Sequence, residues 1–534
     1  MPMSLMTFGH LYLIILLTPN TNKEKHMSNN KSNSSFLNDT LVFLTGVVLA
    51  AIIVIFSVAN IMHYTAHLEA DIASETLLSE VLYENNHIQP DTWIASTATR
   101  IIGPPLLASF IYPLTGYNLN LSMGIACTVM MLILCLCMLF FCRSIGLNWL
   151  QSLTAILIMF MLSSPSDETQ RMLYLYANYY VAHFIPMFII LGLYARALKK
   201  RKLPVLFWII GIVLAVINGI QGMHASMFVY LPLLGAELLR TLIFYIKKRR
   251  ALKDTTLWAF VLSAICLVCA KIFGAYMSGG ASRNIRHAPE KFMDVVLPNF
   301  LDVLPYSRLK WVVIGFIVLA VIGYVISFFH YNKSPELWSA LPIVFGIIVV
   351  LLSATFTTAE VAPRYFVMQV FAVGIGCSML MRLFKYQNGF IVAILAVVYG
   401  AVSVTVFYDG LIASDNSESS AYYQIATWME SKGYEYGYST FDHANTITVM
   451  SNNRVKVRGI DSFEKLNGIK WLTDATWYPP TKDTAGKTCY IVTKHTKDDF
   501  DTWLSENNPK IVDSQDIEGF TVYVLDKDYT VMNP

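Results

Sequence analysis

The stretch HYTAHLEADIASETLLSEVLYENNHIQPDTWIASTATR, residues 63–100, separates the first long apolar run from everything that follows it. It predicts a surface loop with a short helix, held against one face of a membrane protein. Acidic side chains at such a place can act chemically on a hydroxyl group. The stretch gathers six carboxylates: Glu69, Asp71, Glu75, Glu80, Glu84 and Asp91.

The composition indicates a multi-pass membrane protein. The chain has 534 residues, of which 55% are hydrophobic and 14% are charged, and its mean hydropathy is +0.50. Soluble domains carry about 25% charged residues, and many runs here approach the roughly 20 apolar residues that span a bilayer. The net charge of +3 comes from short basic clusters beside apolar runs, so no nucleic-acid binding is expected.

Three regions are expected along the chain. Residues 1–40 form an amino-terminal cytoplasmic segment, in which the residues before Met27 are interpreted as an over-extended start. Residues 41–408 form the transmembrane domain, with an outer loop at 63–120. Residues 409–534 form a small extracytoplasmic α/β domain.

About eleven transmembrane helices are predicted. Residues 101–116 are apolar but contain three prolines, which remove backbone hydrogen bonds and clash with the preceding turn, so they predict a surface half-helix. The predicted spans are 41–62, 121–142, 149–164, 174–195, 203–220, 225–246, 256–277, 309–330, 337–356, 365–384 and 388–408.

Charge predicts the orientation of these spans. With the amino terminus inside, the basic clusters at 196–202 and 247–253 fall in inner loops, as the excess of Lys and Arg in cytoplasmic loops requires. The acidic loop, the loop at 278–308 and the tail after 409 then face outward.

The tail alternates helical and β-prone patterns, which is typical of an α/β domain. Its length of about 120 residues is enough for one core. Strands are predicted at 454–460, 488–493 and 519–525, and helices at 419–432, 442–450 and 498–507.

Glu69 and Asp71 are the leading candidates for chemistry. A helix that begins near Ile72 places both carboxylates at its amino end, where the helix dipole stabilises negative charge. A carboxylate there can act as general base or help to hold a divalent metal. A solvated acidic face that caps the helix is the open alternative.

The same helix is predicted to be amphipathic and to lie along the membrane surface. One side presents apolar residues toward the protein or the lipid, namely Ala73, Leu77, Leu78, Val81 and Leu82. Glu75, Ser79 and Glu80 are expected to face water.

Two cationic side chains at outer helix ends are candidates for binding phosphate. Lys271 lies inside the span 256–277, where an ionisable group indicates a functional site, although a lysine can also snorkel to the interface. Arg364 opens the span 365–384 and can grip a phosphate with two parallel hydrogen bonds. A pair with Glu360 is the alternative for Arg364.

The outer loop 278–308 carries a basic group made of Arg283, Arg286 and His287, preceded by two glycines. It can close over an anionic group or be an ordinary solvated loop. His183 falls within a span and is interpreted either as a substrate-lining residue or as a hydrogen-bonded core histidine. Tyr180 belongs to a tyrosine-rich segment that predicts either an interfacial belt or a sugar-stacking wall.

Three features together resemble the GT-C superfamily of polytopic membrane glycosyltransferases, in particular members from Gram-positive bacteria. They are the acid-x-acid pattern Glu69-Ala70-Asp71 in the first outer loop, the pair Arg364-Tyr365 that opens a late span, and the α/β domain after the last span. The resemblance covers nearly the whole chain from about Leu41. The family pattern commonly has Asp at the first acidic position, where this chain has Glu69, so Asp71 is favoured as the catalytic acid.

The resemblance implies a sugar donor linked to polyprenyl phosphate, a cell-surface glycan or polymer as acceptor, membrane lipids around the spans, and a place in the bacterial cell membrane. Asp71, assisted by Glu69, is expected to act as base in an inverting single displacement. No cofactor is predicted. A divalent metal, Mg or Mn, would be held by Glu69 and Asp71 if the reaction uses one, although Glu69 at the family's Asp position argues against a two-Asp metal site. The donor phosphate is expected at Lys271, Arg364, Arg283 and Arg286. The substrate-lining candidates are His183, Tyr180, Tyr365, Glu360 and His287.

Two other functions stay open from the sequence. A polysaccharide polymerase or ligase would use the cationic loop 278–308 as its centre. A flippase or transporter of lipid-linked glycans would often show paired repeats with interrupted helices at matching positions, and none is evident in the sequence.

Overall fold

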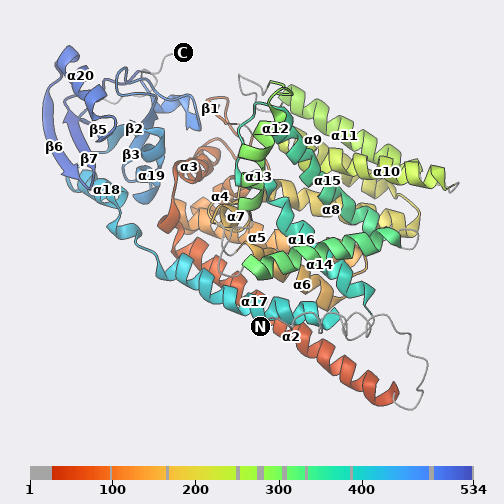
Figure 1. Ribbon diagram of the computed structural model, residues 1–534. Helices are drawn as coiled ribbons and strands as arrows, with labels where there is room; N and C mark the ends of the chain where they lie inside the picture. The colour runs from red at the N-terminus through yellow and green to blue at the C-terminus, as the bar shows by residue number, and fades with distance from the viewer. Residues whose placement is uncertain are drawn as a thin grey trace.

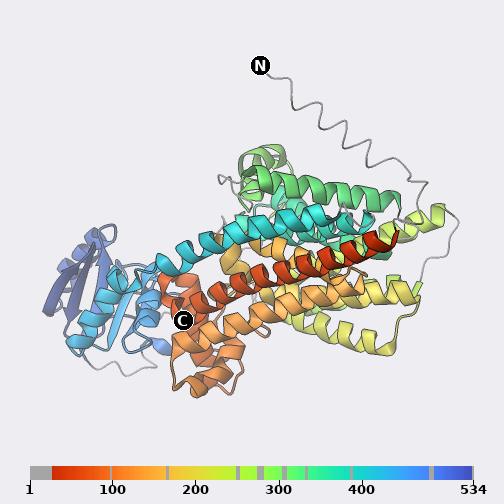
Figure 2. The ribbon, with the colours of Figure 1, turned by 90° about the horizontal axis from the view of Figure 1, so that it is seen from below.

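The computed structural model describes residues 27–96, 99–163, 167–247, 253–273, 282–303, 310–330, 335–384, 389–479 and 486–531. A bundle of long helices forms one part of the molecule, and a small sheet domain lies at one end of it (Figure 1). Helices α2 (Met27–Met62), α5 (Leu119–Ser144) and α17 (Gly389–Tyr408) run side by side in both views, with α2 between the other two (Figure 2).

Each of the eleven predicted spans overlaps a helix. Within the described residues, nine helices are long and apolar enough to cross a membrane. They are Phe36–Met62, Leu119–Ser144, Val181–Lys200, Ser226–Ile246, Lys253–Phe273, Lys310–Phe329, Leu337–Phe356, Pro363–Leu383 and Gly389–Ser431. The two remaining predicted spans are shorter apolar helices, α6 (Trp149–Leu162) and α9 (Val205–Ile220). The polytopic helical architecture is therefore confirmed.

The predicted outer loop after the first span, called the first outer loop from here on, is a small folded unit. It contains η1 (Tyr64–His67), α3 (Ala70–Glu84), the short strand β1 (Trp93–Ile94), α4 (Pro104–Ile111) and η2 (Tyr112–Thr115). The proline-rich piece forms only the eight-residue α4 and the turn η2, and neither is among the nine long helices. The prolines stand at the first positions of α4, where their missing N–H groups have no helical partner to lose.

The prediction that Glu75, Ser79 and Glu80 of α3 face water is wrong. Its apolar residues are buried as expected, but Glu75 and Ser79 are buried as well, and Glu80 is half-buried. Helices α4 and α5 cover one side of α3, and α19 (Phe441–Met450) of the carboxy-terminal domain covers another. Side chains that the sequence assigns to water therefore meet a second protein layer.

The carboxy-terminal domain is built on a five-stranded sheet with the order β3-β2-β5-β7-β6. The three predicted strands are β3 (Lys456–Ile460), β5 (Thr488–Thr493) and β7 (Phe520–Leu525). Strands β2 (Tyr436–Thr440) and β6 (Ile511–Ile517) were not predicted, and β6 is a mostly exposed strand at the sheet edge that lacks an apolar signal. Strand β2 is parallel to both β3 and β5, whereas β7 is antiparallel to β5 and β6.

Helices cover both faces of this sheet. Buried residues of α18 (Ala421–Ser431) and α19 pack with one set of strand residues, and those of α20 (Lys497–Asn507) pack with another. All three helices match predicted helical segments. The small carboxy-terminal α/β domain is thus confirmed.

The domain docks on the first outer loop. Strand β1 pairs with β4 (Thr473–Asp474), and Asn445 Nδ2 donates to Ser74 Oγ at 2.8 Å. Asn453 Nδ2 donates to both oxygens of Glu80, at 2.6 and 2.8 Å. These bonds hold α3 between the helical bundle and the sheet domain.

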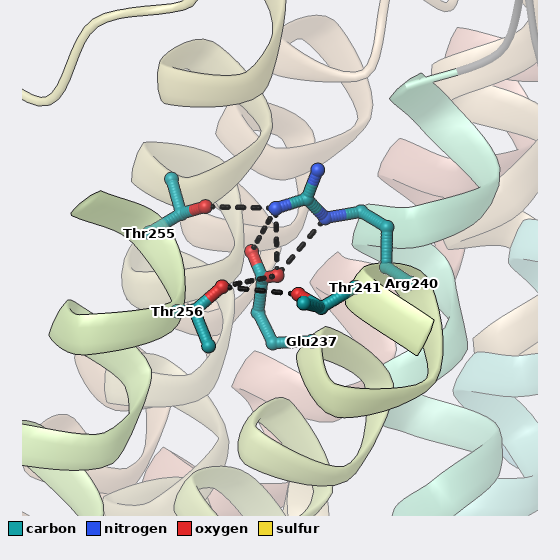
Figure 3. A network of polar contacts seen from close by, with 5 residues as sticks. All are labelled: Glu237, Arg240, Thr241, Thr255 and Thr256. Carbon is teal, nitrogen blue, oxygen red and sulfur yellow. Dashed lines mark hydrogen bonds and ion pairs between the residues drawn. The ribbon is translucent and has the colours of Figure 1, made fainter. Parts of the chain in front are cut away.

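Inside the bundle, a buried ion pair within α10 (Leu231–Ile246) is hydrogen-bonded to α11 (Lys253–Phe273) (Figure 3). Arg240 donates to both oxygens of Glu237, with a shortest distance of 2.7 Å, and to Thr255 Oγ1 at 3.0 Å. Thr256 Oγ1 lies 3.4 Å from Glu237 Oε2 and 3.1 Å from Thr241 Oγ1. Each charge in the network therefore has polar partners within the bundle.

Candidate functional site

Asp71 lies in the first turn of α3. Glu69 precedes this helix as its N-cap residue with extended backbone. The Asp71 carboxylate is partly buried and has no hydrogen-bond or ion-pair partner among the residues that the structure describes. Burial raises the pKa of Asp71, as does the negative charge of Glu69, while Arg364 and Arg100 act in the opposite direction. A partly buried carboxylate with a raised pKa and no partner can accept a proton.

The short helix α7 (Asp167–Leu173) links the first outer loop to a later helix start. Arg171 Nη1 binds Glu69 Oε2 at 2.8 Å. Three residues earlier in the same helix, Glu168 Oε1 lies 3.4 Å from Nη1 of Arg364, which belongs to η6 (Pro363–Phe366). Two arginines and two glutamates are thereby gathered around the side of α3 that carries Asp71.

Arg100 closes the other side of the site. Its Nε and Nη2 lie 2.7 and 2.6 Å from Glu75 Oε1, and both side chains are largely buried. The guanidinium also lies over the ring of Tyr179, 5.6 Å from its centroid. The charge of Glu75 is thus compensated inside the protein.

An irregular segment presents two tyrosines to this group. Three consecutive residues, Tyr176, Ala177 and Asn178, have positive φ angles of 38°, 72° and 23°, which are rare for residues other than glycine. Asn60 of α2 binds the Tyr174 carbonyl at 2.9 Å and the Tyr176 N–H at 3.1 Å. Asn178 donates to the Cys127 carbonyl of α5 at 2.9 Å.

This segment corrects the predicted span 174–195, because α8 begins only at Val181 and continues to Lys200. Tyr179 and Tyr180 consequently end the irregular segment and do not lie within a helix. Burial raises the pKa of Tyr180, and the neighbouring Tyr365 raises it further. Arg364 lies 5.8 Å from the centroid of the Tyr365 ring.

Six of the predicted site residues gather in this region: Asp71, Glu69, Arg364, Tyr180, Tyr365 and His183. Burial and the charges of Asp71, Glu75 and Glu69 raise the pKa of Tyr179, which places Tyr179 within electrostatic reach of the acidic pair. The Tyr180 ring lies 6.0 Å from the His183 ring.

The other five predicted residues lie apart from this group in the described contacts. Lys271 is exposed in the last turn of α11, and Glu360 is exposed before η6. Arg283 and Arg286 are exposed, and Arg283 pairs through its backbone with Thr357.

His287 pairs instead with Glu290 at 3.1 Å. Of the predicted loop 278–308, the residues outside 282–303 lie beyond the described part of the chain. Arg364 pairs with Glu168 and not with Glu360, the partner that the sequence offered as an alternative.

Four residues of the site were not predicted: Arg100, Glu168, Arg171 and Tyr179. Arg100 is the last residue of the acidic stretch. Glu168 and Arg171 stand three apart in the sequence DETQRML, which places them on one face of a helix. That spacing was the available signal. The partner of Arg171, Glu69, is 102 residues away in the chain, and the partner of Glu168, Arg364, is 196 residues away.

A magnesium or manganese ion would have few protein ligands here. Among the described residues, no group of three or more His, Cys, Asp or Glu side chains could hold a metal ion. Glu69 and Asp71 supply two carboxylates, of which Glu69 is bound by Arg171. Magnesium is often held by one or two carboxylates together with substrate phosphates and water, so the pair fits magnesium only with such additional ligands.

Neither a protein-family model nor a curated protein sequence matches this chain. Among solved structures, it is similar to ArnT from Cupriavidus metallidurans bound to undecaprenyl phosphate, with 12% identity and a TM-score of 0.50 over 91% of this chain and 98% of ArnT. For ArnT in the apo state, the identity is 11% and the TM-score 0.51, over 90% of this chain and 97% of ArnT.

The likeness extends over nearly the full length of both proteins, so it includes the helical bundle and the carboxy-terminal domain. ArnT is a GT-C glycosyltransferase. The chain therefore shares its overall fold with ArnT, as the resemblance to the GT-C superfamily in its acid-x-acid loop and late Arg-Tyr pair led us to expect.

Proposed function

We propose that this protein is a membrane glycosyltransferase that moves a sugar from a polyprenyl-phosphate donor to a hydroxyl group of an extracytoplasmic glycan or polymer. The likeness of the fold to that of ArnT supports this proposal. The structure of ArnT contains bound undecaprenyl phosphate, a polyprenyl phosphate. The observation that carries it is Asp71, a partly buried carboxylate without a described partner, beside a cluster of arginines.

In the proposed reaction, Asp71 accepts the proton of the acceptor hydroxyl while the oxygen of that hydroxyl attacks the anomeric carbon of the donor sugar. The bond from that carbon to the phosphate oxygen breaks, and the lipid phosphate leaves with the electron pair. A single displacement inverts the anomeric configuration. Glu69 favours a raised Asp71 pKa through its negative charge, which increases the basicity of the ionised form.

Arg364 is the best-placed group to receive the departing phosphate. Its side chain is 39% exposed, and its contact with Glu168 is 3.4 Å long, so a phosphate oxygen can compete for the guanidinium. Fixed positive charge that meets developing negative charge is a large source of catalysis. Lys271, Arg283 and Arg286 stay sequence-based candidates without a described contact to this site.

We further propose that the chain lies in a bacterial cell membrane with its amino terminus inside and its carboxy-terminal domain outside. The docking of that domain on α3 supports a role in holding the acceptor beside Asp71. A labelling test with single cysteines in the two termini would check the orientation. Activity measured with and without added magnesium and a chelator would show whether the reaction needs a divalent metal.

The central experiment compares Asp71→Asn with Asp91→Asn in purified protein. Asp91 is an exposed acid of the same stretch and serves as the matched control. We expect Asp71→Asn to lose roughly 10²–10⁴-fold of sugar transfer from polyprenyl-phosphate donors, since that is the usual contribution of a general base. Asp91→Asn should keep wild-type activity. Full transfer by Asp71→Asn would remove the centre of the proposal.

A further inference from the structure

Four buried polar atoms near Arg100 have no hydrogen-bond partner within the described residues. They are Tyr179 Oη, His183 Nδ1, Gln221 Nε2 and His224 Nδ1. Buried polar groups in folded proteins nearly always have partners, and a group of such atoms without them calls for water or a ligand. Their proximity to one another makes this a single site.

The geometry brings these residues together from two segments, 179–183 and 221–224. The rings of His183 and His224 are stacked, with centroids 5.5 Å apart and an interplanar angle of 25°. Tyr180 lies 6.0 Å from the first ring and 6.1 Å from the second. Tyr179 precedes Tyr180 and lies beneath the guanidinium of Arg100.

Gln221 is oriented by the backbone directly after the acidic stretch. Its Oε1 accepts the backbone N–H groups of Ile101 and Ile102, the residues that follow Arg100. The amide oxygen is thus used, and the amide nitrogen remains to donate to something else. This residue ends α9 as its C-cap, one turn before His224.

The site has little net charge. Glu75 compensates Arg100. Burial favours the neutral form of an imidazole, and burial together with Arg100 lowers the pKa of His224 to about 4. Neutral imidazoles, an amide and a phenol offer both hydrogen-bond donors and acceptors.

This chemistry fits a neutral group rich in hydroxyls, next to aromatic rings such as those of Tyr180 and Phe228. A phosphate would find no unpaired cation among these side chains. A protonated amino group would find no negatively charged partner among these four side chains. Arg100, which lies over Tyr179, binds Glu75, one turn after Asp71 on α3. The site therefore lies beside the acidic pair, where it can hold the ring whose anomeric carbon reacts.

We propose that Tyr179, His183, Gln221 and His224 form a subsite that binds the hydroxyl groups of an uncharged donor sugar. This inference rests on the proposed glycosyltransferase function and narrows its substrate class. It assigns recognition of the sugar to these four residues and recognition of the lipid phosphate to Arg364.

The test measures binding to the full-length protein in detergent or nanodiscs. The probes are bare undecaprenyl phosphate and the same lipid carrying glucose, N-acetylglucosamine, 4-amino-4-deoxyarabinose or glucuronic acid. The variants are Tyr179→Phe and His183→Phe. Tyr245→Phe serves as the control, because Tyr245 is 81% exposed at the end of α10.

We expect wild-type protein to bind at least one uncharged-sugar lipid more tightly than the bare, amino-sugar and uronic-acid lipids. Tyr179→Phe and His183→Phe should weaken binding of that lipid roughly tenfold each, since each removes one hydrogen bond to a neutral group. Binding of bare undecaprenyl phosphate and thermal stability should stay at the level of Tyr245→Phe.

Several results would overturn the subsite. One is equal or tighter binding of a charged-sugar lipid, and another is no gain from any uncharged sugar over the bare lipid. A third is an equal loss of bare-lipid binding in the variants, which would make the cluster structural. These results leave the glycosyltransferase proposal standing, whereas failure of wild-type protein to bind any polyprenyl phosphate would remove both.

Discussion

Two buried Glu–Arg pairs in this molecule have different surroundings. Arg240 and Glu237 lie within the bundle, where the neighbouring threonines of α11 add further hydrogen bonds (Figure 3). Arg100 and Glu75 lie at the outer end, where they border four buried polar atoms without described partners. In the first network, Glu237 and Arg240 bind each other and the threonines of α11. The four polar atoms beside the second pair have no described partner.

The difference separates structure from function. A buried polar network with all its members bonded makes a rigid core, whereas an incomplete one costs stability unless something else completes it. Proteins keep such local violations at functional sites. The pair Glu237–Arg240 is therefore interpreted as a clamp between α10 and α11, and Arg100–Glu75 as the frame of a binding site.

The largest effect on stability is expected from Glu237→Gln. This change leaves the Arg240 charge buried without its counter-ion, and breaking a buried pair in this way costs about 3–5 kcal/mol. Thermal unfolding in detergent should show the loss, while transfer activity of the remaining folded protein should be unchanged. The double variant Glu237→Leu/Arg240→Met should recover most of the stability, and a loss equal to that of Glu237→Gln would contradict the clamp interpretation.

Arg364→Gln should lower activity without lowering stability, the reverse of the effect expected for Glu237→Gln. Because Arg364 is partly exposed and its contact with Glu168 is long, we expect little change in stability. Sugar transfer should fall about 10²-fold, as it does when a group that stabilises developing charge is removed. Steady-state kinetics should place the loss mainly in kcat. Arg286→Gln, on the exposed outer loop, is the matched control, and equal losses in both variants would speak against a specific phosphate contact.

The pH dependence of transfer should report on Asp71. A base must be ionised, so activity should fall as the pH decreases through the Asp71 pKa, which burial and Glu69 raise above its ordinary value. Glu69→Gln removes a negative neighbour and should move this acid limb to lower pH. Arg364→Gln removes a positive neighbour of Asp71 and should move the acid limb of the remaining activity to higher pH. If the acid limb of the pH profile shifted in the same direction in both variants, a group other than Asp71 would control it.

The smallest effects are expected in the outer loop 282–303. His287 and Glu290 form a pair whose side chains are 61% and 77% exposed, and such surface pairs contribute at most about 1 kcal/mol. Arg286→Ala and His287→Ala should therefore retain wild-type stability and transfer within about twofold. A loss of activity as large as that of Asp71→Asn would instead favour the polymerase or ligase that the loop sequence left open.

The sequence allowed most of the helical framework to be predicted. Long apolar runs identify spans because each must bury its backbone polar groups within the membrane, and prolines at 104, 105 and 113 correctly ruled out a further span. The exception was the start of α8 at Val181. There, side chains of Asn60 and Cys127, on two other helices, hold an irregular backbone that local sequence patterns cannot reveal.

The candidate site was predicted only in part. The acid pair and Arg364 were recognisable, because charged residues at the ends of apolar segments stand out and match a family pattern. Arg100, Glu168 and Arg171 were missed, because their roles depend on contacts between segments far apart in the chain. The polar face of α3 was assigned to water because no local signal shows that α19 covers it.

By itself, the sequence determined that this chain crosses a membrane many times, carries acids in the loop after its first apolar helix and ends in a small α/β domain, since apolar length, charge and periodicity are local properties. Tertiary structure alone decided which charges meet. It paired Arg171 with Glu69 and Arg364 with Glu168, buried Glu75 against Arg100, and left Asp71 without a described partner. The physical reason is that the charge state and reactivity of a carboxylate depend on burial and neighbouring charges, which only the folded chain brings together.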